Sequence, residues 1–471
     1  MENEEILDSV IEENDNSIHG IGIKDFELEE FKEAIIKADH EALDNVYDSF
    51  QPADIATELE EFDDDELAQS VSLFSDEQLA EIIENSDEDM HIRIVKYLDN
   101  GSVLKIFKFM AKDDVADFLG NIPTDRRKQI VDLMTGGDKR TIHELLGYSE
   151  DSAGGLMTTA YIALSETLST IDALKKIKQI GPKTEVIETI FVLNHAKQLI
   201  GTADLRDILV AGEEDLLRDM IEGDAEPICV EPDVDQEEVS RLFAEYDLKV
   251  LPVVNKRRAM LGIITVDDII DVINEEHTED LYQMAGVGKE ESLDNSIPES
   301  IKMRLPWLLV NLLTAFLAAV TIKAFEGVIQ QVVALSATMT IVSGMGGNAG
   351  TQTLSIMIRS IALGEVEFKD CWKILLREVM IGLANGFATG LATGLIVWLM
   401  YGNIYLGVII LMAMIGNLII AGVFGILIPV ILKVLKLDPA LGSTVFVTTA
   451  TDVLGFFIFL GLASMFLPLL A

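Results

Sequence analysis

A single carboxylate interrupts the last apolar stretch of the sequence. Residues 441–470 carry no charge except Asp452, and Thr448 precedes it by four residues, so both side chains share one face of a helix. A carboxylate at the centre of a bilayer costs roughly 2.5 to 3.5 kcal/mol, and such acids pair with a base or meet an ion or a proton. These residue types therefore indicate cation binding or proton transfer.

Asp452 has no basic partner in the apolar part of the chain. The apolar segments hold no Lys, Arg or His in their interior, and all six histidines precede residue 301. A salt bridge between segments is therefore excluded. Two interpretations remain: a protonated aspartate that is hydrogen-bonded to another helix, or a carboxylate that meets a transported cation.

Uncharged polar groups occur in a second apolar segment, in "SGMGGNAGTQ" at 343–352. Its four glycines permit close helix packing or local unwinding, whereas Asn348 and Gln352 stand four residues apart on one helical face. Asp452 with Thr448 and Gly455 on one face favours a wet cavity over a packed interface. The residues expected to line an ion path are Asp452, Thr448, Asn348 and Gln352, with Asn385 and Asn417 as weaker candidates.

A polar lining with one acid per chain fits a hydrated cation. Mg²⁺ gives up its water reluctantly and is often held through that water by one or two carboxylates. Because one carboxylate is few for a divalent ion, we expect a homodimer in which both copies of Asp452 face a shared axis.

Five apolar segments are long enough to cross a membrane. They cover residues 305–322, 328–358, 379–400, 404–432 and 441–470. Basic residues collect before the first segment, between the second and third, and between the fourth and fifth. By the positive-inside rule, we expect a multi-pass protein of the cytoplasmic membrane with its N-terminus in the cytoplasm and its C-terminus outside.

The charge of the chain is divided very unevenly. The 471 residues have a formal net charge of −44; residues 301–471 hold nine Lys/Arg and seven Asp/Glu, whereas residues 1–300 hold 26 and 72. Such an acidic part argues against nucleic acid as a partner and favours cations. No signal peptide begins the chain, so residues 1–300 are expected in the cytoplasm. No nucleophile with a neighbouring base stands out, and we expect no enzymatic activity.

An internal repeat occupies part of the acidic region. Residues 187–209 match residues 248–270 at a constant offset of 61, and each copy predicts strand, turn, strand and helix. The pattern resembles paired cystathionine-beta-synthase-type (CBS) domains, whose G-x-x-T-x-x-D is present as Gly262, Thr265 and Asp268. The resemblance implies that Thr265 and Asp268 hold the ribose of ATP or another adenosine nucleotide; a purely structural turn is the alternative. The first copy departs, with Asp204 in place of the threonine.

Short amphipathic helices with acidic starts are predicted upstream of the repeat, stacked as a small superhelix. The expected fold class is a multidomain membrane protein with an all-α N-terminal domain, α/β tandem CBS domains and an all-α five-helix transmembrane domain. The predicted organisation is a flexible acidic tail at 1–25, a helical N-domain at 26–145, tandem CBS domains at 146–274, a plug-like linker helix at 275–300 and a transmembrane domain at 301–471.

This layout resembles the MgtE family of magnesium channels and transporters. The most specific motifs are "GNAGTQ" at 347–352, "KLDPAL" at 436–441 and "FVTTATDVLG" at 446–455. The resemblance implies that Asp452 binds hydrated Mg²⁺ in a pore on a dimer axis, and that cytoplasmic Mg²⁺ closes the pore. The regulatory ligands it implies are Glu275, Glu276, Asp438, Asp113 and Asp117. After "DPAL" the chain reads "GSTVF" where the family has small residues ending in Gly-Pro, which puts ion selectivity in question.

Two other functions fit the same residues. One is a proton-coupled carrier of divalent cations in which Asp452 cycles its proton, and the other is a membrane-anchored CBS nucleotide sensor without transport. The charge asymmetry favours the gated channel: crowded acids repel one another at low Mg²⁺, and bridging ions would draw the linker helices together over the pore.

Overall fold

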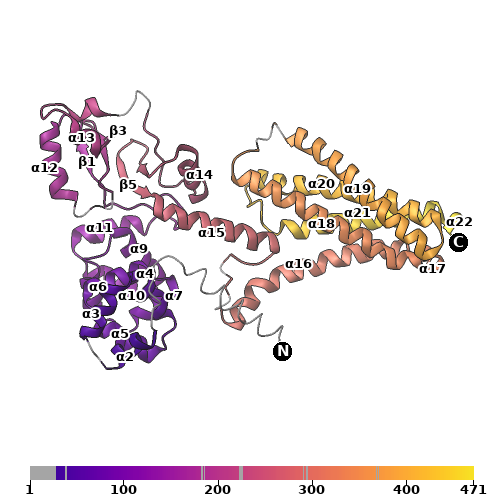
Figure 1. Cartoon of the computed structure of the whole chain (residues 1–471), viewed down its shortest axis with the longest axis horizontal. Coiled ribbons are helices and arrows are strands. Elements are labelled where there is room, and N and C mark those ends of the chain that lie inside the picture. The colour runs from indigo at the N-terminus through magenta and orange to yellow at the C-terminus, as the bar shows by residue number, and fades with distance from the viewer. Residues whose placement is uncertain are drawn as a thin grey trace, which may run out of the picture. The chain divides into compact units, whose positions relative to one another are not determined.

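The structure is a computed structural model that describes residues 28–37, 40–181, 184, 186–221, 226–289, 291–292, 295–366, 369 and 371–470. The predicted tail at 1–25 lies outside these residues. The chain divides after Ile269 into two compact units, which are described separately (Figure 1).

The first unit begins with a series of short helices. They are α2 (Leu28–Ile36), α3 (His40–Ser49), α4 (Pro52–Glu60), α5 (Asp64–Leu73), α6 (Asp76–Glu84), α7 (Glu88–Val95), α8 (Asn100–Ile106), α9 (Lys112–Asn121), α10 (Thr124–Leu133) and α11 (Gly136–Leu145). Acidic residues begin many of them: the Asp63 side chain accepts hydrogen bonds from the first turn of α5, and Asp87 and Asp99 do the same for α7 and α8. Part of the negative charge therefore serves as helix caps.

The helices pack side by side around one apolar core. Its largest members are aromatic: Phe31 contacts Phe62 and Phe74, and Phe107 contacts Phe118 edge to face at a ring distance of 5.6 Å. Successive contacts run between α4 and α6, α5 and α7, α6 and α8, and α7 and α9. This i to i+2 pattern is that of a stacked helical array and confirms the predicted helical domain.

The repeat folds as two similar units. The first copy contains α12 (Thr170–Ile180), β2 (Thr189–Leu193), β3 (Leu199–Asp204) and α13 (Leu205–Val210); the second contains α14 (Gln236–Tyr246), β4 (Val250–Val254), β5 (Met260–Thr265) and α15 (Val266–Ala285). In each, the two strands are antiparallel, and β1 (Ala163–Ser165) adds a parallel strand to β2. A short 3₁₀ helix, η2 (Leu217–Met220), lies between the copies. Strands β2 and β3 recur as β4 and β5 at the offset of 61 in the sequence, so the predicted CBS architecture is confirmed.

Helix α15 is continuous over 20 residues. It ends at Ala285, fifteen residues before the end of the linker helix predicted at 275–300. It begins at Val266, so the last helix of the second repeat and the predicted linker are one helix with no break at residue 275.

The second unit is a bundle of long helices (Figure 1). They are α16 (Ile297–Ala324), α17 (Glu326–Gln331), α18 (Ala334–Ala362), α19 (Cys371–Tyr401), α20 (Ile404–Val434), α21 (Ser443–Met465) and α22 (Leu467–Leu470). Helix α20 is central and packs against α18, α19 and α21. A glycine every fourth residue lets α19 lie directly on α20: the Cβ of a residue at Gly386 would be 2.6 Å from the Ile415 Cα.

Four helices of the described chain are long and apolar enough to cross a membrane: α16, α19, α20 and α21. They account for four of the five expected segments. The remaining segment, 328–358, falls on α17 and α18; α18 has 29 residues but is more polar because of its glycines, serines, threonines and amides. The C-terminal unit is therefore a membrane-spanning bundle in which α18 is the most polar long helix.

Candidate ion-binding site

Asp452 lies near the middle of α21 and faces α18. Its carboxylate accepts a hydrogen bond from the Ser343 hydroxyl, and the side chain is half-buried. Within the described part of the chain, no Lys, Arg or His nitrogen lies within 4 Å of it. The aspartate thus has a hydrogen-bond donor on another helix but, among the described residues, no positive charge beside it. The first interpretation of the sequence includes such a hydrogen bond, and the second is compatible with it.

Thr448 lies one turn before Asp452 on α21. Its hydroxyl donates to the carbonyls of Thr444 and Val445, at 2.9 and 3.1 Å. Gly347 of α18 lies opposite: a Cβ there would be 3.5 Å from the Thr448 methyl. The threonine oxygen keeps acceptor capacity for a water of a hydrated ion, because its hydrogen is used by the backbone.

Asn417 of α20 fills the space behind the Asp452 site. Its side chain is fully buried, and its Nδ2 donates to the Val342 carbonyl of α18 at 2.7 Å, while its Oδ1 has no partner among the described residues. The amide lies between two glycines: a Cβ on Gly455 would be 2.6 Å from Oδ1, and one on Gly346 would overlap Nδ2. The gap at Gly455, expected to favour a wet cavity, is therefore occupied by a packed side chain.

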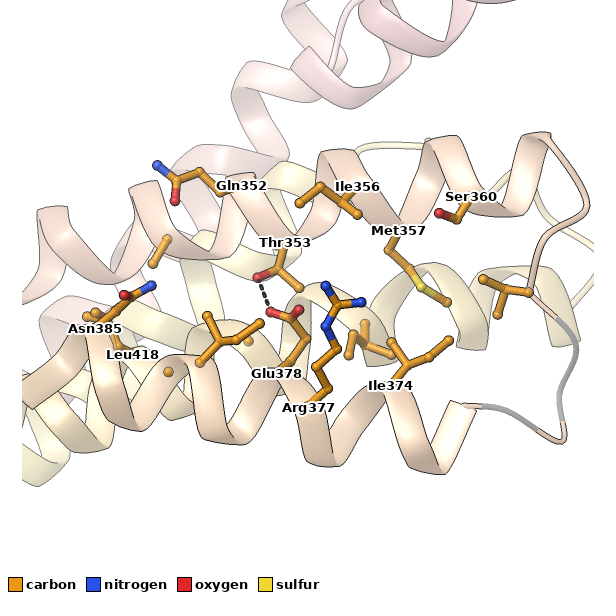
Figure 2. Close-up of a pocket in the computed structure, with 16 residues that line it drawn as sticks. Gln352, Thr353, Ile356, Met357, Ser360, Ile374, Arg377, Glu378, Asn385 and Leu418 are labelled. Carbon is orange, nitrogen blue, oxygen red and sulfur yellow. Dashed lines mark hydrogen bonds between the residues drawn. The ribbon is translucent and has the colours of Figure 1, made fainter.

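The other predicted path residues are divided between two surroundings. Asn348 and Gln352 are exposed on α18, the helix that also carries Ser343. Gln352 and Asn385 line a cavity between α18, α19 and α20 (Figure 2). The structure thus brings Thr448 to the Asp452 turn and places Gln352 at a second polar location.

Two polar residues of the bundle, Ser343 and Glu378, were not among those predicted from the sequence. Ser343 has a recognisable signal, because Ser343, Gly347 and Gly350 follow the i, i+4, i+7 spacing of one helical face. Glu378 precedes the expected third segment by one residue but lies well inside α19, where it accepts a hydrogen bond from Thr353 of α18 at 3.0 Å.

Asp113 and Asp117, predicted as regulatory ligands, lie one turn apart on α9. Loss of solvation, together with the charges of Asp113, Glu150 and Asp268, raises the pKa of Asp117 to about 7. Burial also raises the pKa of Asp113, whose Oδ1 is buried without a partner among the described residues. Among the residues that the structure describes, no base forms an ion pair with either carboxylate, so negative charge is concentrated here.

A second acid pair forms between α15 and the connection that precedes α21. Loss of solvation, together with the charges of Asp438 and Glu279, raises the pKa of Asp280 to about 6. Asp438 is a predicted ligand and accepts a hydrogen bond from the Ala440 amide at 2.7 Å. The predicted Glu275 and Glu276 lie on the same helix as Asp280, which the sequence did not single out.

The predicted nucleotide residues contact each other. The Thr265 hydroxyl donates to the Asp268 carboxylate at 2.6 Å, at the point where β5 meets α15. Burial raises the pKa of Asp268, and the charges of Asp267 and Asp113 act in the same direction. This bond supports the structural-turn alternative and leaves the nucleotide site a prediction.

Within the described residues, no group of three or more His, Cys, Asp or Glu side chains is arranged to hold a metal ion. An ion at Asp452 would depend on its own water or on a second copy of the chain.

Comparison with known proteins identifies the architecture. The family model for a divalent cation transporter, MgtE, matches residues 339–462, the model for the MgtE intracellular N domain matches 50–151, and a CBS domain model matches 217–275. "Magnesium transporter MgtE" of Bacillus subtilis (strain 168) is 33% identical over 358 residues, which are 76% of this chain and 79% of that one. The chain belongs to the MgtE family.

A second MgtE protein gives the same result. "Magnesium transporter MgtE" of Thermus thermophilus is 32% identical over 75% of this chain and 79% of that one. A solved structure described as the cytosolic domain of the Mg²⁺ channel MgtE in complex with ATP covers 52% of this chain and 99% of that one, with 29% identity and a TM-score of 0.49. The expected family is confirmed, and with it the class of activity, Mg²⁺ transport at a membrane.

Proposed function

We propose that this MgtE-family chain conducts hydrated Mg²⁺ across the cytoplasmic membrane past Asp452. The observation that carries the proposal is the setting of this carboxylate: it lies in an apolar helix with a serine donor and, within the described chain, no base nearby. An uncompensated acid in a membrane helix requires a cation or a proton, and the activity of the family supplies the cation.

The proposed path also includes Thr448 and a second copy of the chain. Ser343 orients the Asp452 carboxylate, and the Thr448 oxygen can accept a hydrogen bond from a coordinated water. A homodimer with both copies of Asp452 on one axis provides the two carboxylates that a hydrated divalent ion commonly uses. Nucleic acid has no part in this proposal, because the acidic part of the chain would repel it.

Helix α18 is included as the fifth span, although it is more polar than the other four. A helix that lines a water-filled path loses less by carrying amides and hydroxyls than one that faces lipid. With five spans, the distribution of basic residues gives a cytoplasmic N-terminus and an extracytoplasmic C-terminus.

Closure by intracellular Mg²⁺ is the second part of the proposal. It is supported by two acid groups, one around Asp113 and Asp117 and one around Asp280 and Asp438, in which burial and then neighbouring negative charges raise carboxyl pKa values. A divalent ion would remove this repulsion, and Glu275 and Glu276 would add ligands on α15. The transported ion then favours the closed state wherever it binds that state more tightly.

Magnesium-dependent growth of a transport-deficient host tests the transport proposal. Wild type should restore growth at low Mg²⁺, D452A should not, and E326Q on α17 serves as a matched loss of one carboxylate in the same unit. Rescue by D452A would refute the role of Asp452, and failure of the wild type to restore growth would favour a nucleotide sensor without transport. Rescue that depends on a pH gradient would favour the proton-coupled carrier.

A further inference from the structure

A second carboxylate faces a cavity in the bundle. The cavity lies between α18, α19 and α20, with a volume of about 250 Å³, and its polar lining includes Gln352, Thr353, Arg377, Glu378 and Asn385 (Figure 2). Six waters at about 30 Å³ each occupy roughly 180 Å³. The cavity is therefore large enough for a cation with its first shell of water.

Glu378 is held in place but not neutralised. One carboxylate oxygen accepts the Thr353 hydroxyl hydrogen bond at 3.0 Å, and no Lys, Arg or His nitrogen in the described chain lies within 4 Å. Helix α19, which carries Glu378, packs closely on α20, because a Cβ on Gly422 of α20 would lie 3.2 Å from the Glu378 carbonyl oxygen. The carboxylate thus lies on rigid elements and has unused acceptor capacity.

The cavity is displaced from Asp452 along α18. Thr353 follows Ser343 by ten residues on one continuous helix, which at 1.5 Å per residue is roughly 15 Å along the helix axis. Ser343 contacts Asp452, and Thr353 contacts Glu378. Asn348 and Gln352 lie between these levels and one helical turn apart. Two carboxylates therefore lie at two depths, joined by a polar face of α18.

We propose that Glu378, with the oxygens of Thr353, Gln352 and Asn385, forms a second station for hydrated Mg²⁺ between Asp452 and the end of α18 that carries Arg359. This inference rests on the proposed conduction past Asp452. Conduction requires sites that bind an ion well enough to admit it and weakly enough to release it. A station with one carboxylate and neutral oxygens binds the ion well enough to admit it.

Arg377 makes the binding weak enough for the ion to be released. Its guanidinium lines the same cavity as Glu378 without pairing with it (Figure 2). An arginine is always protonated, so its charge opposes a cation at the station and shortens the time the ion stays there. An acid and a base in one cavity therefore give the station a low affinity for Mg²⁺. Removing the acid should lower this affinity, and removing the base should raise it.

Flux of Mg²⁺ into liposomes containing the full-length protein tests the station. E378Q keeps the size of the side chain and an acceptor for Thr353, and it should raise the half-saturating Mg²⁺ concentration about tenfold, because charge-assisted hydrogen bonds are about twice as strong as neutral ones. E378D should restore most of the affinity, and R377Q should lower the half-saturating concentration. E365Q removes an exposed carboxylate outside the cavity and is the matched control.

Three results would overturn the station. E378Q could behave as E365Q does, or R377Q could shift the half-saturating concentration in the same direction as E378Q. The E378Q defect could also vanish in phosphatidylcholine and phosphatidylglycerol vesicles that lack phosphatidylethanolamine, in which case the cavity holds an ammonium headgroup. D452N separates this inference from the proposed function: if D452N abolishes flux while E378Q has no effect, only the second station fails.

Discussion

Replacing Gly455 by alanine tests whether the packing of Asn417 supports the Asp452 turn. The new methyl group would lie 2.6 Å from the Asn417 Oδ1, and Asn417 is fully buried, so the two helices must separate or the amide must move. Overpacking of this kind costs about 1 to 3 kcal/mol. Gly455 follows Asp452 by three residues, so the displacement should also reach the carboxylate.

Gly461 provides the matched control on the same helix. A Cβ there meets nothing within 4 Å, so G461A shares the gain in helix propensity of about 1 kcal/mol without the overlap. The difference between the two variants isolates the clash, and G455A should be about 1 to 3 kcal/mol less stable than G461A. Thermal unfolding of the purified protein in detergent measures the stability, and Mg²⁺ uptake measures the function.

A size exchange decides whether the amide is the cause. Shortening the asparagine in G455A/N417S should recover most of the loss, because the serine leaves room for the methyl group. Equal melting temperatures for G455A and G461A would refute the reasoning. So would a double variant that is no better than G455A alone, because the lost stability would then come from another contact.

Two further predictions concern the acid group on α9 and the start of α21. The pKa of Asp117 is about 7 in the folded protein, above its ordinary value near 4, so its contribution to stability is complete below about pH 4 and is lost as the pH rises through 7. Without Mg²⁺, proteolysis of the acidic part should accelerate from pH 5 to 8 in the wild type and less so in D117N. An equal pH dependence in the two proteins would contradict the raised pKa of Asp117. G442A should lower the melting temperature more than G402A: both glycines have positive φ, but only a methyl group on Gly442 would overlap the Trp307 ring, and equal losses would exclude this contact.

The regular elements could be predicted because their signals are local. The two repeat copies are matched strand for strand at an offset of 61, whereas helix α15 ends at Ala285, inside the linker predicted at 275–300. The continuity of this helix from the second repeat into the linker was not predicted, since the sequence pattern changes near residue 275 while the backbone hydrogen bonding continues. A change in sequence composition therefore does not mark the end of a helix.

The site was predicted only in part because it depends on helix register. Asp452 stands out from composition alone, but its donor Ser343 is 109 residues away and is identified by how α18 meets α21. The filling of the Gly455 gap by Asn417 depends on the same packing. Glu378 was missed because it adjoins a run of basic residues, and only the start of α19 at Cys371 shows that it lies two turns inside a helix.

Mg²⁺ flux into liposomes with a Mg²⁺ gradient and no pH gradient tests the central claim most directly. The purified full-length protein should carry Mg²⁺ under these conditions, D452N should reduce the flux to that of empty liposomes, and E326Q should resemble wild type. Flux through D452N equal to that of wild type would contradict the claim that a hydrated Mg²⁺ ion passes this carboxylate.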